Sequence, residues 1–181
     1  MHQSMQEFST GPYYFDPQKT SIIWTAYKYT SRLGVSGELP NVKYTPGVRS
    51  IDQLKNVKDI FSDFHFECDV DISEEGSASI RNLNIQKLFF DKLSTPTIHG
   101  KLVSGTSSLT EGNVDVELTF NGVKRICSAR YTVVNNTIEL TCTVHLADFD
   151  AIGALNTLHE GVSELHTGPD GISITWPDVD I

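Results

Sequence analysis

The side chains that could do chemistry in this chain are few, and the first candidate is a serine in the run Gly34-Val35-Ser36-Gly37. A nucleophilic serine on a strand-to-helix turn needs a glycine two residues before it and another two residues after it. Here the first glycine is present, but Glu38 occupies the last position of the pattern. We therefore interpret the run as a β-turn that joins two strands, and not as part of a hydrolase.

Two histidines, His159 and His166, lie seven residues apart and could share one face of a helix. A zinc site needs further protein ligands, and neither a third ligand nor a His-Glu-x-x-His pattern accompanies this pair. We interpret both as structural or surface histidines. The glycine-rich patterns that bind phosphates are also missing from the sequence. The sequence therefore predicts no catalytic residue, no metal and no cofactor, and hence a protein that is not an enzyme.

Three cysteines, Cys68, Cys127 and Cys142, complete the side chains of chemical interest. Their number is odd, no Cys-x-x-Cys pair occurs, and all three fall inside strand-like runs, so we expect buried free thiols in a reducing compartment. Residues 1–12 lack the apolar stretch of a signal peptide. We expect a cytoplasmic protein, or a periplasmic one if a leader has been removed.

The composition is that of an ordinary globular domain, with 39% hydrophobic and 20% charged residues among 181. A chain of this length fits one domain, which we place at 13–181 after a flexible tail at 1–12. Fourteen basic and twenty-three acidic residues give a net charge of −9, which repels phosphate backbones and anionic lipids. We therefore expect no nucleic-acid partner. No run approaches the roughly 18 apolar residues that a membrane span needs, so we expect no integral membrane segment.

The elements that must position these side chains are mostly strands with one buried face. Between Phe64 and Ile72 every second residue is apolar, which no helix can produce. From Val114 to Leu146, Asn121-Gly122 and Asn135-Asn136 are typical two-residue hairpin turns. Both turns place the same apolar face inward, and a slip of one residue would invert it. The predicted cross-strand sets are Val116–Cys127–Val144, Val114–Ala129–Cys142 and Tyr131–Leu140. Cys127 and Cys142 are then diagonal neighbours, which disfavours a disulfide.

Eight or nine predicted strands favour a closed barrel over a sandwich, because the strands are long and the hairpins tight. We predict an all-β fold with minor helices, an eight-stranded antiparallel β-barrel with short helices in its connections. The remaining predicted strands are 13–16, 21–30, 41–45, 97–105 and 171–176, and the predicted helices are 80–93, 149–166 with Asp148 as N-cap, and a shorter one at 51–59.

Four motifs, in order, carry a resemblance to a known family. They are Tyr14-Phe15-Asp16 with 20–24, the run 34–37, the segment with Arg81, Phe89-Phe90-Asp91 and Pro96, and LTFNGVKR at 118–125 followed by 147–149. On these motifs the chain resembles, over nearly all of 13–181, the YceI-like family of bacterial, lipocalin-like, polyisoprenoid-binding barrels. It departs from the family pattern at Asn84, Gln86 and Lys87 after the arginine, and in a longer helix after Phe149.

The resemblance implies an eight-stranded lipocalin-like barrel whose interior takes up isoprenoid or fatty chains such as quinone tails. We expect a carrier or sequestering protein with a hydrophobic small molecule as its partner, and the sequence leaves open whether it forms a homodimer. Two alternatives also remain open, an enzyme acting on a bound lipid-like substrate and an interaction module with a solid core. The predicted ligand contacts are Trp24, Phe64, Phe66, Phe89, Phe90, Val116, Phe120, Arg125, Tyr131, Leu140 and Val144.

Arg125 is the one charged residue in this set. The two hairpins place it on the inward face, opposite Leu118 and Leu146, where an unpaired guanidinium would cost several kcal/mol. In one interpretation it reaches water or pairs with Asp148. In the other it marks the mouth of the barrel and binds a polar ligand head group. We also expect a continuous cavity from Tyr131 to Phe89 and Phe90.

Overall fold

The structure, a computed structural model, describes residues 13–47, 50–51, 58–72, 80–106, 108 and 110–181. The tail predicted at 1–12 lies outside these residues. Most of the short helix predicted at 51–59 also lies outside them. At its two ends, Ile51 belongs to strand β5 (Ser50–Ile51), and residues 58–59 begin helix α1 (Lys58–Phe61).

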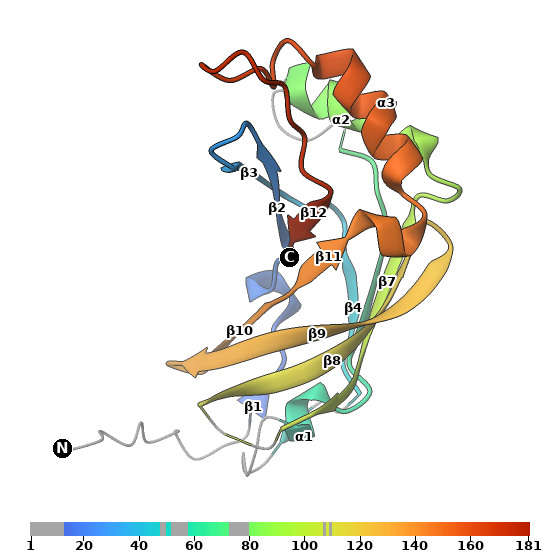
Figure 1. Cartoon of the computed structure of the whole chain (residues 1–181). Coiled ribbons are helices and arrows are strands. Elements are labelled where there is room, and N and C mark those ends of the chain that lie inside the picture. The colour runs from blue at the N-terminus through green and yellow to red at the C-terminus, as the bar shows by residue number, and fades with distance from the viewer. Residues whose placement is uncertain (1–12, 48–49, 52–57, 73–79, 107, 109) are drawn as a thin grey trace, which may run out of the picture.

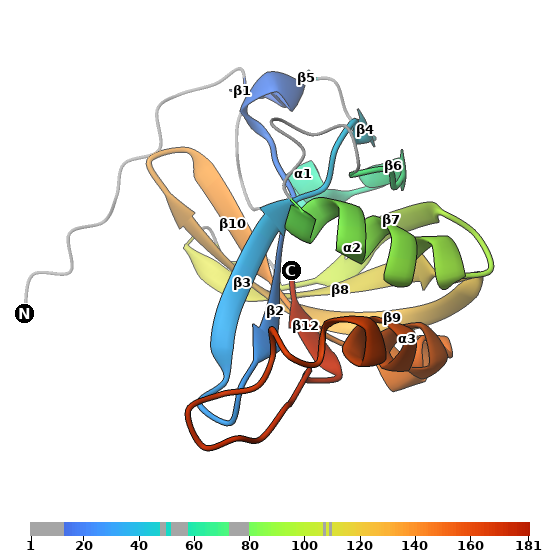
Figure 2. The ribbon, with the colours of Figure 1, turned by 90° about the horizontal axis from the view of Figure 1, so that it is seen from above.

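The largest element of the fold is a curled antiparallel sheet that forms a half-barrel (Figure 1). Figure 2 shows how far β8 and β9 wrap around the interior. The order is β10-β9-β8-β7-β6-β4, with bounds Thr137–Thr141, Val123–Val134, Glu111–Phe120, Thr97–Gly105, His65–Asp69 and Lys43–Thr45. The chain is therefore mostly β, as predicted, but its strands lie in sheets of six, four and two, and the count of eight is not confirmed.

Both hairpin turns predicted from the sequence are confirmed. The four turn residues, Asn121, Gly122, Asn135 and Asn136, all have positive φ. Phe120 pairs with Val123 and Val133 with Ile138 in the predicted register. Alternate residues of β8 and β9 are buried on one face of the sheet, which confirms the predicted apolar face.

The prediction for the third strand of the meander is wrong beyond Thr141. β10 ends there, and β11 (Thr143–His145) pairs with β12 (Asp178–Asp180) instead of continuing along β9. Cys142 exchanges two backbone hydrogen bonds with Ile181, both 2.8 Å long, which turns the chain away from β9. The predicted pairings of Val144 with Cys127 and of Cys142 with Ala129 therefore do not form.

A second, four-stranded sheet has the order β11-β12-β2-β3. Its strands β2 (Ile23–Lys28) and β3 (Leu33–Glu38) form a hairpin in which Trp24 pairs with Gly37. The run 34–37, predicted as a turn, is therefore the centre of β3. A Cβ at position 37 would collide with the Trp24 indole, so glycine is required by close packing and not by a turn. The strand predicted at 171–176 is reduced to isolated bridges, such as that between Thr175 and Lys28.

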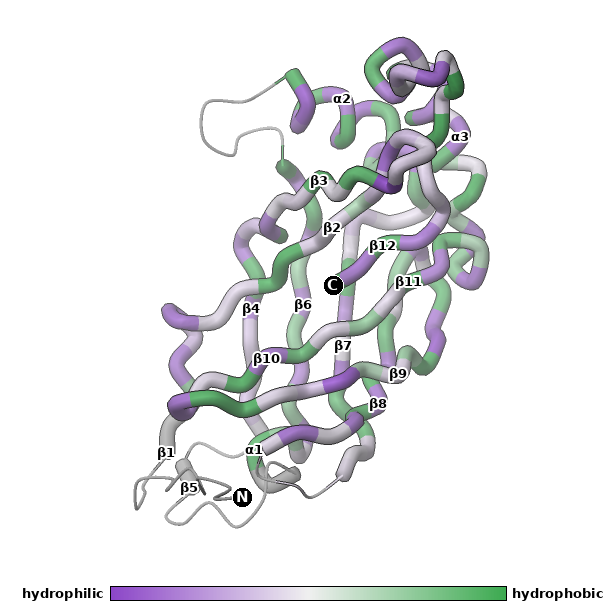
Figure 3. Tube along the Cα trace, turned by 60° about the vertical axis from the view of Figure 1, so that its left-hand side comes forward, coloured by the Kyte–Doolittle hydropathy of each residue, from purple (hydrophilic) through white to green (hydrophobic). Residues whose placement is uncertain are grey.

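Two helices lie side by side across one end of the half-barrel, with β1 (Tyr13–Tyr14) and β5 near the other end (Figure 3). α2 (Ile80–Leu88) stops before the predicted 93 and is followed by a 3₁₀ turn at Phe90–Lys92. α3 (Ile152–Val162) begins later than predicted. Asp148 lies in a preceding 3₁₀ turn (Leu146–Phe149) and does not cap the helix, because Asp150 adopts a left-handed conformation in between.

The buried side chains form two separate clusters. The larger one lies beneath α2 and α3 and includes Phe89, Phe90, Phe120 and Phe149. The smaller cluster lies towards α1 and is centred on Tyr131, which is completely buried. The interior of the half-barrel is thus divided into a helical end and a solid end. The members of the second cluster are Phe61, Leu102, Val114, Val116, Ala129, Tyr131 and Val133.

Asn121 does more than form a turn, and this leads to a prediction. Its Oδ1 accepts a hydrogen bond from the Ser94 N–H at 2.7 Å, and its Nδ2 donates to the Phe149 carbonyl at 2.8 Å. We expect Asn121→Gly, which suits the positive φ but removes these bonds and a third, from Nδ2 to the Asp150 carbonyl, to lower the free energy of unfolding by about 2 kcal/mol. Urea denaturation measures this change. Asn136→Gly, at an exposed turn position that also has positive φ, is the control, and an equal loss there would contradict the assignment.

Candidate functional site

A partly open cavity of about 630 Å³ lies within the helical end of the half-barrel. This volume falls in the range of small-molecule binding sites. The six-stranded sheet, the four-stranded sheet and helices α2 and α3 all contribute to its walls. The cavity therefore has no counterpart in any single sequence motif. Its apolar lining includes Ile22, Trp24, Ala26, Val35, Phe66, Ile85, Phe89, Phe90, Leu118, Phe120, Val144, Leu155, Leu158, Val162 and Val179.

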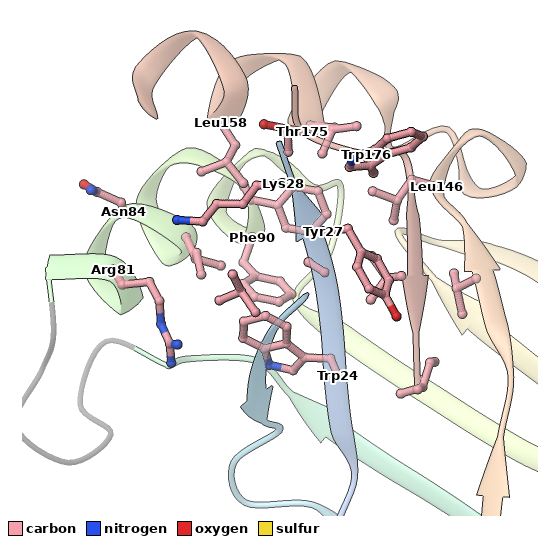
Figure 4. Close-up of a pocket in the computed structure, with 18 of the residues that line it drawn as sticks. Trp24, Tyr27, Lys28, Arg81, Asn84, Phe90, Leu146, Leu158, Thr175 and Trp176 are labelled. Carbon is pink, nitrogen blue, oxygen red and sulfur yellow. The ribbon is translucent and has the colours of Figure 1, made fainter. Parts of the chain in front are cut away.

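The strand period directs the side chains of β2 into this cavity. Alternate residues point to one face of a sheet, so Trp24, Ala26 and Lys28 share the inner face. On the outer face the Thr25 hydroxyl is 2.7 Å from that of Ser36. Figure 4 shows Trp24 and Lys28 projecting from β2 towards the space beneath α2. One strand therefore supplies an aromatic ring, a small residue and a cation to the same wall.

Aromatic rings form the floor of the cavity. The rings of Phe89 and Phe90 meet edge to face, with centroids 5.2 Å apart, and Phe89 stacks on Phe120 at 6.4 Å. Phe120 in turn meets Phe149 edge to face at 5.8 Å. Such contacts hold large side chains in fixed positions, so the floor is preorganised for an apolar ligand.

Six of the eleven ligand contacts predicted from the sequence line the cavity, and five do not. The residues that line it are Trp24, Phe66, Phe89, Phe90, Phe120 and Val144. The residues that do not are Phe64, Val116, Arg125, Tyr131 and Leu140. Val116 and Tyr131 belong to the second buried cluster, and Phe64 and Leu140 pack against it. This cavity therefore does not reach Tyr131, contrary to the continuous cavity expected from the sequence.

Arg125 is exposed, although it pairs with the buried Leu118 as predicted. Its Nη1 donates a hydrogen bond to the Lys124 carbonyl at 2.9 Å, and it does not contact the cavity. The prediction placed Leu146 on its other side by extending β10, and that ladder is absent because β11 pairs with β12. Of the two interpretations, the structure supports the one in which the side chain reaches water.

A polar rim on the cavity is the feature that the sequence analysis missed. It consists of Lys28, Arg81, Asn84, His166 and Thr175, contributed by β2, α2 and the segment after α3. The spacing of His159 and His166 was the one available signal, and it gave no hint of the partner. The fold brings these residues together from distant parts of the chain, so no local sequence pattern predicts them.

The two histidines meet at one hydroxyl. The Nδ1 atoms of His159 and His166 lie 3.0 and 2.5 Å from Oγ1 of Thr175. A hydroxyl has one proton and two acceptor sites, so at most one imidazole can accept from Thr175, and the other must donate to it. Burial lowers the pKa of His166, and the positive charge of Lys28 lowers it further. The three side chains thus satisfy one another with His166 neutral.

The Trp24 indole N–H is buried in the cavity wall and has no acceptor among the described residues. The guanidinium of Arg81 lies 6.0 Å from the centre of the same ring system, where a cation is attracted to the aromatic face. Trp24 therefore connects the apolar wall to the polar rim.

The three cysteines are free thiols, and none suits nucleophilic chemistry at neutral pH. Burial raises the pKa of Cys68 and of Cys142 to about 11, and it also raises the pKa of Cys127. A thiol reacts through its thiolate, which these pKa values disfavour. Among the described residues, no group of three or more histidine, cysteine or acidic side chains is placed to hold a metal ion.

The fold and the site together define a curled antiparallel β protein with an apolar cavity under two helices. No protein-family model matches the chain, and no curated protein matches it. The YceI-like resemblance therefore rests on the sequence motifs alone. None of the described helices combines the length and the hydropathy that crossing a membrane requires.

Proposed function

We propose that this protein binds an elongated apolar ligand, such as an isoprenoid, a quinone tail or a fatty chain, and carries or sequesters it without catalysing a reaction. The lipocalin-like barrel of the YceI-like family is part of this proposal. The observation that supports it most directly is the apolar cavity of about 630 Å³ with its preorganised aromatic floor.

The apolar walls of the cavity suit a hydrocarbon chain better than a polar metabolite. Each methylene buried in such a site contributes about 0.8 kcal/mol, so ten methylenes supply about 8 kcal/mol before the cost of association is subtracted. No strong polar anchor is required for affinity at that level. The interaction module with a solid core, by contrast, fits only the Tyr131 end of the molecule.

An enzyme acting on a bound lipid-like substrate is the second candidate, and one observation favours it. The Thr175 hydroxyl lines the cavity and is flanked by two imidazoles, as an activated nucleophile would be. Among the described residues, however, no carboxylate is hydrogen-bonded to either imidazole to orient it. This weakens the second candidate.

Extraction of the purified protein with organic solvent, followed by mass spectrometry, tests the proposal. We expect a long-chain compound in an amount approaching one per protein molecule, or, for protein stripped of lipid, binding of hexadecanoate with a micromolar or lower dissociation constant. A stripped protein that binds no long-chain compound in calorimetry would contradict the proposal.

A further inference from the structure

Among the described residues, the charged side chains that line the cavity are basic. They are Lys28 and Arg81, and no described aspartate or glutamate contributes to the lining. The whole chain has the opposite balance, with 23 acidic and 14 basic residues. A cavity of positive sign within an acidic protein attracts anions locally while the outer surface repels them.

Lys28 is the better placed of the two cations. It is half-buried on the inner face of β2, and its Nζ lies 4.7 Å from the centre of the Tyr29 ring. The ion pairs among the described residues are Arg32–Asp178, Lys124–Glu117 and Arg130–Glu111, so no described carboxylate neutralises it. A partly desolvated ammonium without a counter-charge is unfavourable, and an anion in the cavity would relieve this.

The surroundings of Lys28 suit a head group. Figure 4 shows its side chain reaching from β2 towards α2, which carries Arg81 and Asn84; the Arg81 side chain extends towards Trp24, whereas the Asn84 amide points away from Lys28. The guanidinium of Arg81 is a hydrogen-bond donor for carboxylate or phosphate oxygens. Thr175, His159 and His166 are already occupied with one another, so they are not needed as the anchor.

We infer that the ligand is an amphiphilic anion, whose carboxylate or phosphate head group binds Lys28 at the rim, with Arg81 as a second donor, while its chain fills the apolar cavity. This inference rests on the proposed function and adds the chemical class of the ligand. A hydrogen bond between a cation and an anion, formed away from bulk water, corresponds to about tenfold or more in affinity.

Calorimetric titration with three probes that share a sixteen-carbon chain tests this inference. The probes are hexadecanoate, hexadecyl phosphate and hexadecanol, which separate a carboxylate, a phosphate and a neutral head group. We expect the protein to bind at least one of the anions about tenfold or more tightly than hexadecanol. The preferred anion then distinguishes a fatty-acid ligand from a lipid phosphate.

Variants assign the preference to Lys28. Lys28→Met keeps the length of the side chain without its charge, and we expect it to lose about tenfold or more of its affinity for the preferred anion while hexadecanol binding stays within about twofold. Lys28→Arg should retain the preference, and Arg81→Met should reduce it in part. Lys43→Met, which removes an exposed lysine on β4 outside the cavity, is the matched control.

The outcomes separate this inference from the proposed function. Equal affinity for all three probes, or an anion preference that survives in both Lys28→Met and Arg81→Met, would overturn the head-group inference and leave the proposed function standing. Failure of the wild-type protein to bind any of the three would overturn both. Melting temperatures of the variants show whether each remains folded.

Discussion

Replacing Ala26 by tryptophan should reduce the affinity for a long-chain ligand by about 100-fold or more while the protein stays folded. Ala26 lies on the inner face of β2 between Trp24 and Lys28, and it lines the cavity. An indole added there occupies space that the ligand chain would fill, and an aromatic side chain buries about 150–250 Å². Because the new ring enters a cavity and not a packed core, the change in stability should be smaller than the roughly 1–3 kcal/mol of overpacking.

Titration of hexadecanoate into the stripped variant measures this effect, and Thr25→Trp is its control. Thr25 is the neighbouring residue on the outer face of the same strand, so the same ring added there does not enter the cavity. We expect Thr25→Trp to bind like the wild type. A folded Ala26→Trp protein with unchanged affinity would show that ligands bind elsewhere.

Tyr131→Ala should have the opposite effect, a loss of about 3–5 kcal/mol in the free energy of unfolding with little change in affinity. Tyr131 is completely buried at the solid end, and its ring meets Phe61 edge to face at 5.3 Å. Its hydroxyl lies 2.9 Å from the Ser108 carbonyl and 3.2 Å from the Thr106 carbonyl, within hydrogen-bonding distance of both. Removing the side chain therefore leaves a void and unsatisfied backbone groups.

Chemical denaturation measures the loss, and two milder variants separate its parts. Tyr131→Phe removes only the hydroxyl and should lower the free energy of unfolding by about 1–2 kcal/mol. Tyr131→Trp would block a ligand cavity that extended to this residue. We expect it to change the free energy of unfolding but not the affinity for hexadecanoate. A Tyr131→Trp protein that is as stable as the wild type but fails to bind hexadecanoate would mean that the two ends of the interior are connected.

The sequence by itself determined most strands of the six-stranded sheet, their buried faces and two hairpins, because these follow from interactions between near neighbours. Asn121-Gly122 favours positive φ through its own residue types, and this sets the pairing of β8 with β9. The alternation from Phe64 to Ile72 likewise predicted that Cys68, Val70 and Ile72 are buried. The same local patterns were sufficient to select six of the residues that line the cavity.

Only the tertiary structure decided two features: the division of the interior into a helical end and a solid end, and the polar rim of the cavity. A three-residue strand at the end of the chain, too short to show a pattern, pairs with β11 and draws it away from β9. That one contact removes the predicted ladder beside Arg125, and the cations at the cavity are Lys28 and Arg81, not Arg125. Pairing of this kind depends on which distant segment forms the better hydrogen bonds with the same backbone groups. The alternation of apolar residues in a strand shows which face is buried, but it does not show which other strand pairs with it.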